Sequence, residues 1–158
     1  MLGDNIQDVI LITTGGTIDK SYNEMDGSLS NRDSLLKNQI LDMLRLPYTN
    51  IHLFNIINKD SLHFTDYDRS LLAKTLSVQL ERGLPIIVLH GTDTMAKSAE
   101  FCLNTLSDVS VPIIFTGAMT PMGFTTSDAR QNVTEALLAS KLLTSGVYIS
   151  FHNRIFTV

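Results

Sequence analysis

The sequence predicts one α/β domain over residues 1–158, with a doubly wound, flavodoxin- or Rossmann-like parallel sheet of about five strands. Three observations support this fold class. Short apolar runs alternate with helical patterns along the chain. The length of 158 residues, with 44% apolar and 18% charged residues, fits a single globular domain. Polar residues follow each apolar run, at the positions where open parallel sheets bind ligands.

The five predicted strands are short apolar runs bounded by turn residues. Because helical patterns lie between them, the runs are expected to pair in parallel, with helices on both faces of the sheet. They span residues 9–12, 51–57, 85–89, 111–115 and 147–151.

Four helical patterns lie between these runs. The second has the clearest boundaries, because Thr65 is a suitable N-cap, Asp68 follows three residues later and Gly83 lies just past the end. The other three patterns cover residues 30–44, about 95–106 and about 128–143.

Charge and composition argue against several classes of function. The net charge is −4 and Lys and Arg form no stripe, so a nucleic acid is not an expected partner. No stretch approaches the ~20 apolar residues that a membrane span requires, and the N-terminal residues have no signal-peptide pattern. The single cysteine, Cys102, forms no internal disulfide, which fits a reducing compartment. We therefore expect a cytoplasmic protein without membrane contact.

Each predicted strand is followed by polar, hydrogen-bonding residues. The carboxyl ends of parallel strands share one edge of the sheet, so these five segments are expected to meet there. Any one of them is also what an ordinary capped turn requires, and only their combination indicates a site. The segments are TTGGTIDK at 13–20, KDS at 59–61, HGTDTM at 90–95, TGAM at 116–119 and HNR at 152–154.

The residues at this edge indicate hydroxyl and carboxylate chemistry without a metal or cofactor. The histidines have no metal-ligand spacing, and no G-x-S-x-G, G-x-G-x-x-G or P-loop motif is present. A threonine hydroxyl is a weak nucleophile that needs a base or a shared proton network. Two threonines on facing loops, with Asp93 beside one of them, supply the parts for acyl transfer. The helix after the third strand would offer N–H groups to a developing oxyanion.

Two of these segments resemble signature motifs of the bacterial-type L-asparaginase/glutaminase family. The segments TGGTI at 14–18 and HGTDTM at 90–95 stand in the family's order and at about its separation, and the resemblance runs from about residue 9 to 154. It implies that Thr17 is the catalytic nucleophile and that Thr92 and Asp93 form a second catalytic element.

The resemblance also implies which residues bind the substrate. Ser61 matches a residue that binds the substrate carboxylate, and Asp60 lies in the same pocket segment. Ala118 matches a position that contacts the substrate through its backbone. Gly16 and Gly91, in the two signature segments, let a ligand approach the main chain.

Three features of the family are less complete in this chain. Tyr22 is the expected counterpart of the family's lid tyrosine, at a shorter spacing, in a polar segment 19–29 that suits a lid. The family pairs a lysine with its second threonine and aspartate, expected shortly after the last strand, and the sequence reaches Val158 before one. Lys97, four residues past Asp93, is the candidate substitute. The family's second domain is also absent, so an N-terminal-type domain is predicted.

Four side chains near the edge have structural interpretations. His90 is expected to fix its turn rather than to act as a base. Ser127 and Asp128 are expected to cap the fourth helix. His152 fits either a structural or a catalytic role.

The sequence thus predicts an amidohydrolase that releases ammonia from a small amide such as asparagine. A small-molecule amide or amino-acid binding or regulatory module without turnover is the alternative. A flavodoxin-like nucleotide binder ranks last because it lacks a phosphate motif. A homo-oligomer, most simply a two-fold dimer, is expected because one sheet face would leave part of the fourth helix uncovered. The apolar positions in question are Ala136, Leu137, Ala139, Leu142 and Leu143.

Overall fold

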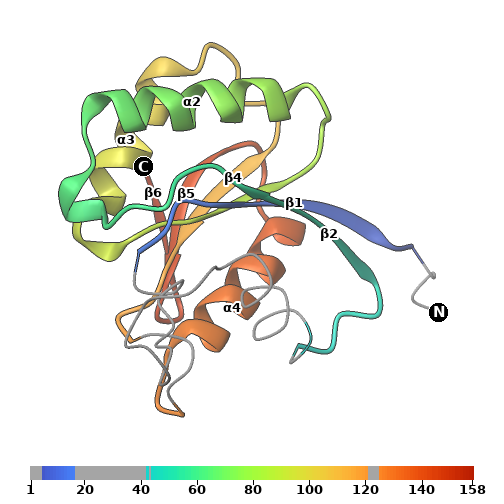
Figure 1. Ribbon diagram of the computed structural model, residues 1–158. Coiled ribbons are helices and arrows are strands. Elements are labelled where there is room, and N and C mark those ends of the chain that lie inside the picture. The colour runs from blue at the N-terminus through green and yellow to red at the C-terminus, as the bar shows by residue number, and fades with distance from the viewer. Residues whose placement is uncertain (1–4, 17–41, 43, 121–124) are drawn as a thin grey trace.

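The computed structural model describes residues 5–16, 42, 44–120 and 125–158. These residues form a six-stranded sheet with helices on both faces (Figure 1). Helices α2 (Asp66–Leu80) and α3 (Met95–Thr105) cover one face, and α4 (Ala129–Leu142) covers the other. The predicted doubly wound α/β architecture is confirmed.

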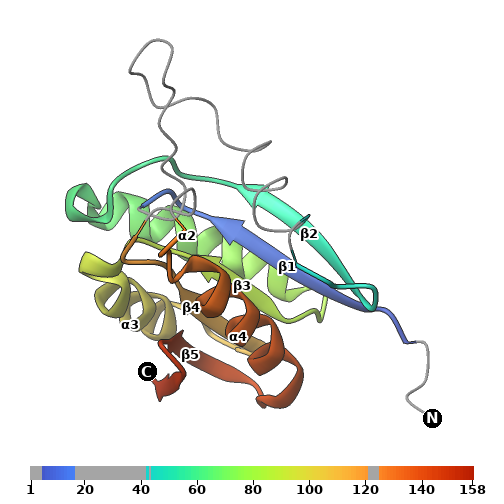
Figure 2. The ribbon, with the colours of Figure 1, turned by 90° about the horizontal axis from the view of Figure 1, so that it is seen from below.

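The sheet has the strand order β2-β1-β3-β4-β5-β6. Figure 2 shows the first five of these side by side, and each pairs in parallel with its neighbour. Strand β6 is antiparallel to β5. The order of the first five strands is that of the flavodoxin-like sheet. The strands are β1 (Gln7–Thr13), β2 (Thr49–Asn55), β3 (Ile86–Leu89), β4 (Pro112–Thr116), β5 (Gly146–Phe151) and β6 (Arg154–Thr157).

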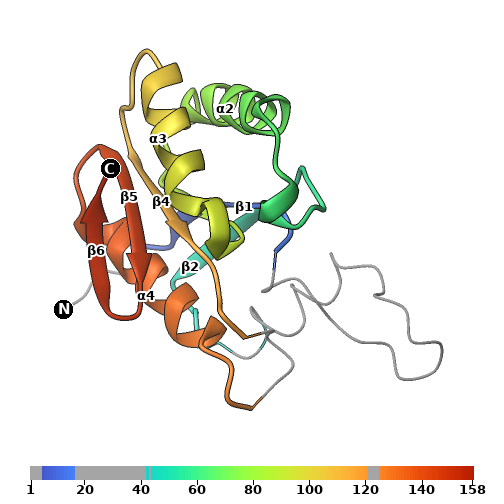
Figure 3. The same cartoon turned by 90° about the vertical axis from the view of Figure 1, so that its left-hand side faces the viewer.

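Strand β6 is the difference from the predicted sheet of about five parallel strands. It follows β5 after a two-residue turn, His152 and Asn153, whose φ angles are +47° and +61°. Two positive φ angles define the turn that best joins a tight β-hairpin. Figure 3 shows the hairpin at the edge of the sheet. The sequence analysis predicted no strand after residues 152–154, because His-Asn lacks the glycine that usually marks such a turn.

The boundaries of α2, α3 and α4 agree with the predicted ones to within about two residues. Thr65 caps α2 in a complete capping box, because its hydroxyl accepts from the Asp68 amide while the Asp68 carboxylate accepts from the Thr65 amide. The helical pattern predicted over residues 30–44 falls largely outside the described residues. Two short 3-10 turns were not predicted: η3 (Ser61–His63) and η4 (Thr92–Thr94).

Strands β1, β3 and β4 alternate their side chains between two hydrophobic cores. On the α4 side, Val9, Leu11 and Ile87 belong to one buried cluster; on the α2 and α3 side, Ile10 and Ile86 belong to the other. This burial on both faces explains why the strand sequences are continuously apolar. Within the described ranges, no helix is long and apolar enough to cross a membrane.

The prediction of an uncovered face on α4 is largely wrong. Ala136, Leu137 and Ala139 are buried against the sheet, and Leu143 packs against the same cluster. Leu142, in contrast, is 73% exposed. The helical spacing of Ala136, Leu137 and Ala139 brings all three to the core side of α4, so these residues do not support a dimer.

Candidate functional site

The carboxyl ends of β1 and β3 lie next to each other at the point where the strand order reverses, because β2 lies on one side of β1 and β3 on the other. In doubly wound sheets this topological switch point is where ligands bind. The segment 14–16 follows β1, and the segment 90–94 follows β3. The described part of the first motif segment, 14–16, therefore meets the second motif segment at this switch point.

Gly16 and Gly91 bring these two loops into backbone contact. Gly16 has a φ of +90°, and a Cβ built on it would lie 2.8 Å from both the Cα and the backbone nitrogen of Gly91. A Cβ on Gly91 would in turn collide with the side chain of Ser61. Glycine is therefore required at both positions, for the contact as well as for the left-handed backbone at Gly16. The contacts join the loops after β1, β3 and β2.

Hydrogen bonds hold the same loops together. The amide and the hydroxyl of Thr14 both donate to the Leu89 carbonyl, at 3.1 and 2.9 Å. The Lys59 amide donates to the Thr14 carbonyl at 3.3 Å, and the Thr94 hydroxyl donates to the Ser61 carbonyl at 2.8 Å. Thr14 and Thr94 thus hold these loops together. The sequence did not predict this structural role, because both threonines stand in motifs that are typical of turns.

The predicted substrate-binding residues lie around this contact. Ser61 is fully buried, and its hydroxyl has no hydrogen-bond partner in the described part of the chain. A buried hydroxyl without a partner is costly unless a ligand or water satisfies it, which agrees with a binding role. The Asp60 carboxylate accepts from the Leu62 amide at 3.1 Å and caps η3. Ala118, 1% exposed, lies in the loop after β4.

Thr92 and Asp93 lie in η4, at the start of α3. Thr92 is half-buried and lines an apolar hollow of about 320 Å³ together with Met95, Ala96, Ile149, Phe151 and Phe156. Asp93 and Lys97 are both exposed, and no ion pair joins them among the described residues. Gly91, at the N-cap position of η4, has no side chain that could cap it, and the Thr94 side chain does not cap α3. Oriented backbone amides therefore remain at this end. Thr17 and Tyr22 lie outside the described residues.

His90 is buried and fixes the turn between β3 and η4. Its Nδ1 lies 2.7 Å from the Gly91 carbonyl oxygen, which can only accept, so Nδ1 carries the proton. Burial lowers the pKa of His90 to about 4, and the nearby charge of Arg69 acts in the same direction, against the opposing effect of the bond to Gly91. The imidazole is therefore neutral at pH 7. Its position agrees with the expected structural role.

The neutral state of His90 makes stability depend on pH in a defined window. The unfolded chain protonates this imidazole near pH 6.5, whereas the folded chain does so only near pH 4. Between these values the unfolded state binds more protons, so the free energy of unfolding falls as the pH drops from about 6.5 to 4, by roughly 3 kcal/mol for this group. Urea unfolding at a series of pH values measures the fall.

The variant His90→Asn is the control, because it keeps a donor near the Gly91 carbonyl and does not titrate. The free energy of unfolding of this variant should therefore depend less on pH in this window. A slope identical to that of the wild type contradicts the assignment.

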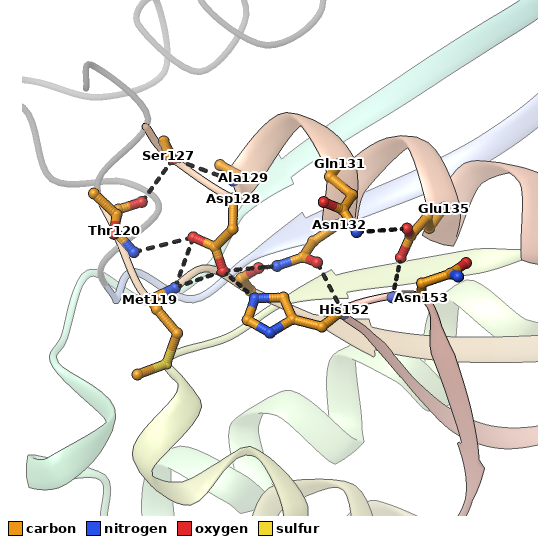
Figure 4. Close-up of polar contacts among 11 residues, drawn as sticks. Met119, Thr120, Ser127, Asp128, Ala129, Gln131, Asn132, Glu135, His152 and Asn153 are labelled. Atoms are coloured by element: carbon orange, nitrogen blue, oxygen red, sulfur yellow. Dashed lines mark hydrogen bonds and ion pairs between the residues drawn. The ribbon is translucent and has the colours of Figure 1, made fainter. Parts of the chain in front are cut away.

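A polar network on α4 was not predicted. Asp128 occupies the N-cap position of α4, but its carboxylate accepts from the amides of Met119 and Thr120 instead of capping its own helix (Figure 4). Ser127 provides the cap, accepting from the Ala129 amide at 3.1 Å. The expectation that Asp128 caps the helix is therefore corrected. Nothing local in the sequence could show that this carboxylate reaches back to a loop eight and nine residues earlier.

Other nucleophiles and metal centres find no support in the described residues. Cys102 is fully buried in α3, and burial raises its pKa to about 12, so the thiol is not a nucleophile at neutral pH. No group of three or more His, Cys, Asp or Glu side chains there is arranged to hold a metal ion. In the described residues, the chemistry available at the switch point is that of hydroxyls, backbone amides and the carboxylates of Asp60 and Asp93.

Comparisons with known proteins identify the family. The chain is 28% identical over 149 residues to an L-asparaginase of Thermococcus kodakarensis, covering 93% of this chain and 44% of that protein. It is also 28% identical over 149 residues to L-asparaginase 1 of Escherichia coli, covering 90% of this chain and 43% of that protein. The solved structure of the thermostable L-asparaginase from Thermococcus kodakarensis superimposes with a TM-score of 0.87 at 25% identity, covering 96% of this chain and 46% of that structure.

The chain thus spans less than half the length of these relatives. Residues 8–158 match the family model described as asparaginase, N-terminal. The chain belongs to the asparaginase family and corresponds to the N-terminal part of its relatives.

Proposed function

We propose that this chain carries the catalytic residues of an amidohydrolase that releases ammonia from a small amide such as asparagine. The single observation that carries the proposal is the backbone contact between Gly16 and Gly91. Gly16 directly precedes Thr17 in the sequence, so the contact supports a site shared by Thr17 and the loop that holds Thr92 and Asp93. The relatives described above are L-asparaginases, which supports an amide as the substrate class.

In the proposed reaction the Thr17 hydroxyl attacks the amide carbon. A C–O bond forms, the C–N bond breaks, and the leaving nitrogen takes a proton and departs as ammonia. Water then hydrolyses the ester, giving the acid and the free hydroxyl. Thr92 and Asp93 take part in the proton transfers, and uncapped amides of the η4 turn stabilise the oxyanion. Ser61 receives the carboxylate of the substrate, and Ala118 and Asp60 bind its polar groups. We assign Tyr22 to the lid over this site.

The alternative is a binding or regulatory module that keeps the pocket without turnover. Asp93 is exposed, and among the described residues no ion pair joins it to Lys97. Both observations favour slow proton transfer, and so favour the alternative. The two candidates predict the same ligand but differ in ammonia release. Under either of them we propose a two-fold dimer, which light scattering would detect.

The test measures ammonia release from L- and D-asparagine and L- and D-glutamine by the purified chain, with binding measured in parallel by calorimetry. Turnover that disappears in Thr17→Val, with binding retained, supports the hydrolase. Binding without ammonia release supports the module. Neither binding nor release of ammonia for any of the four amides contradicts both proposals.

A further inference from the structure

The loop after β4 is held from the side of α4 by three side chains: Asp128, Asn132 and Ser127, whose hydroxyl donates to the Thr120 carbonyl at 2.7 Å. The Asn132 side chain is fully buried; its amide nitrogen donates to the Gly117 carbonyl at 2.9 Å and to Asp128 at 3.1 Å. The Asp128 carboxylate accepts from the Met119 amide at 3.0 and 3.1 Å and from the Thr120 amide at 3.1 Å. Figure 4 shows these contacts.

Both peptide groups that flank Ala118 are therefore bound on one side. Asn132 binds the carbonyl of the Gly117–Ala118 peptide, and Asp128 binds the N–H of the Ala118–Met119 peptide. In a trans peptide the carbonyl and the N–H point in opposite directions, and the described residues have no cis bond. The remaining groups, the N–H and the carbonyl of Ala118 itself, are consequently turned away from α4.

Gly117 also lies against the loop after β3. A Cβ on Gly117 would collide with the His90 carbonyl oxygen and would lie 3.0 Å from the Cε of Met95. The hydrogen bonds from Asp128 and Asn132 thus hold the loop of Gly117 and Ala118 next to the loop that continues into Thr92.

The tip of the β5–β6 hairpin completes the network. The His152 Nε2 donates to the Asp128 carboxylate at 2.6 Å, and the His152 amide donates to the Asn132 side-chain oxygen at 3.1 Å. Burial raises the pKa of Asp128, but the bonds from His152, Met119 and Thr120 outweigh it and hold the pKa below its ordinary value. The carboxylate is therefore ionised and accepts all of these bonds at neutral pH.

We propose that Asp128 and Asn132 are positioning residues for the amidohydrolase site, which fix the backbone of Ala118 so that its N–H and carbonyl face the bound ligand. The inference rests on the proposed function for the nature of that ligand, a small amide with a donor for the Ala118 carbonyl. Its geometric part, the fixed orientation of residues 117–120, is independent of the reaction.

The chain offers a matched control about two turns beyond Asp128 on the same helix. Glu135 accepts from the Asn153 amide at 2.7 Å and so anchors the same hairpin tip, but none of its bonds reaches residues 117–120. A purely structural role of the network would make Asp128→Ala and Glu135→Ala equivalent. A positioning role makes only Asp128→Ala affect the ligand.

The experiment compares wild type, Asp128→Ala, Asp128→Asn and Glu135→Ala as full chains. For Asp128→Ala we expect kcat/KM for asparagine to fall about 100-fold, mostly in kcat, because small displacements of a positioning group have effects of this order. The Asn variant keeps an acceptor for the Met119 amide and should recover most of the loss. Glu135→Ala should keep the wild-type kcat and KM even where its thermal midpoint falls.

Amide hydrogen exchange at Met119 and Thr120, followed by NMR, tests the geometry without turnover. These amides should be protected in wild type and Glu135→Ala, and should exchange much faster in Asp128→Ala. Unchanged exchange in Asp128→Ala overturns the inference, as does an equal kinetic loss in Glu135→Ala. A wild-type chain that releases no ammonia defeats the proposed function, while the exchange rates still decide the positioning of the loop. If Asp128→Ala does not fold, Asp128→Ser takes its place in both readouts, because the shorter serine side chain does not reach the Met119 and Thr120 amides as the carboxylate does.

Discussion

Gly16→Ala should abolish most of the ammonia release and destabilise the chain. A Cβ at this position meets the Gly91 backbone at 2.8 Å, so one of the two loops must move. The φ of +90° adds backbone strain of roughly 1–2 kcal/mol for any residue with a Cβ. In the proposed site Thr17 follows Gly16 and acts together with Thr92, so we expect separation of the loops to slow the reaction. A displacement of about 1 Å at reacting groups costs on the order of 100-fold in rate. Steady-state kinetics and thermal unfolding measure the two effects.

Gly83→Ala is the control for this substitution. Gly83 follows α2 with a φ of +65°, and a Cβ there would meet nothing within 4 Å. Gly83→Ala therefore introduces backbone strain without a steric clash. The substitution lies on the turn between α2 and β3. We expect a modest fall in the thermal midpoint and wild-type kcat/KM. If both variants lose activity equally, the Gly16–Gly91 contact is not what assembles the site.

The parts of the fold that were predicted from sequence are those determined locally. The buried strands appear as apolar runs because both faces of the sheet are covered, and α2 is predictable because Thr65 and Asp68 form its capping box within four residues. Strand β6 was missed because His152 and Asn153 adopt positive φ angles without glycine. All four of its side chains are exposed, so no buried pattern marks it.

The polar contacts of the site were harder to predict because they join distant residues. Asn132 contacts Gly117 and His152, which lie 15 and 20 positions away. An asparagine inside a helical pattern is ordinarily a solvent-facing residue, and only the fold shows that Asn132 is fully buried. The signature segments at 14–18 and 90–95 were recognisable because their chemistry is concentrated in a few consecutive residues.

Thr92→Val should lower kcat by about 100-fold or more while the chain remains folded, since a group taking part in proton transfer contributes on the order of 10²–10⁴ to the rate. Valine has nearly the shape of threonine, and the apolar hollow beside Thr92, formed by Met95, Ile149, Phe151 and others, accepts the added methyl group. The thermal midpoint should therefore stay close to that of the wild type.

The control for Thr92→Val is Thr105→Val, at the exposed end of α3, the helix that follows η4. The Thr105 hydroxyl donates to the Phe101 carbonyl of the preceding turn. We expect the kcat of this control to equal the wild-type value. Calorimetric binding of asparagine separates a catalytic role of Thr92 from a binding role, because a hydrolase that loses only a proton-transfer group should still bind its substrate within a few-fold. Wild-type kcat in Thr92→Val would remove this residue from the catalytic element. Loss of binding together with kcat would make Thr92 a binding residue, and proton transfer would then have to come from Asp93 or another group.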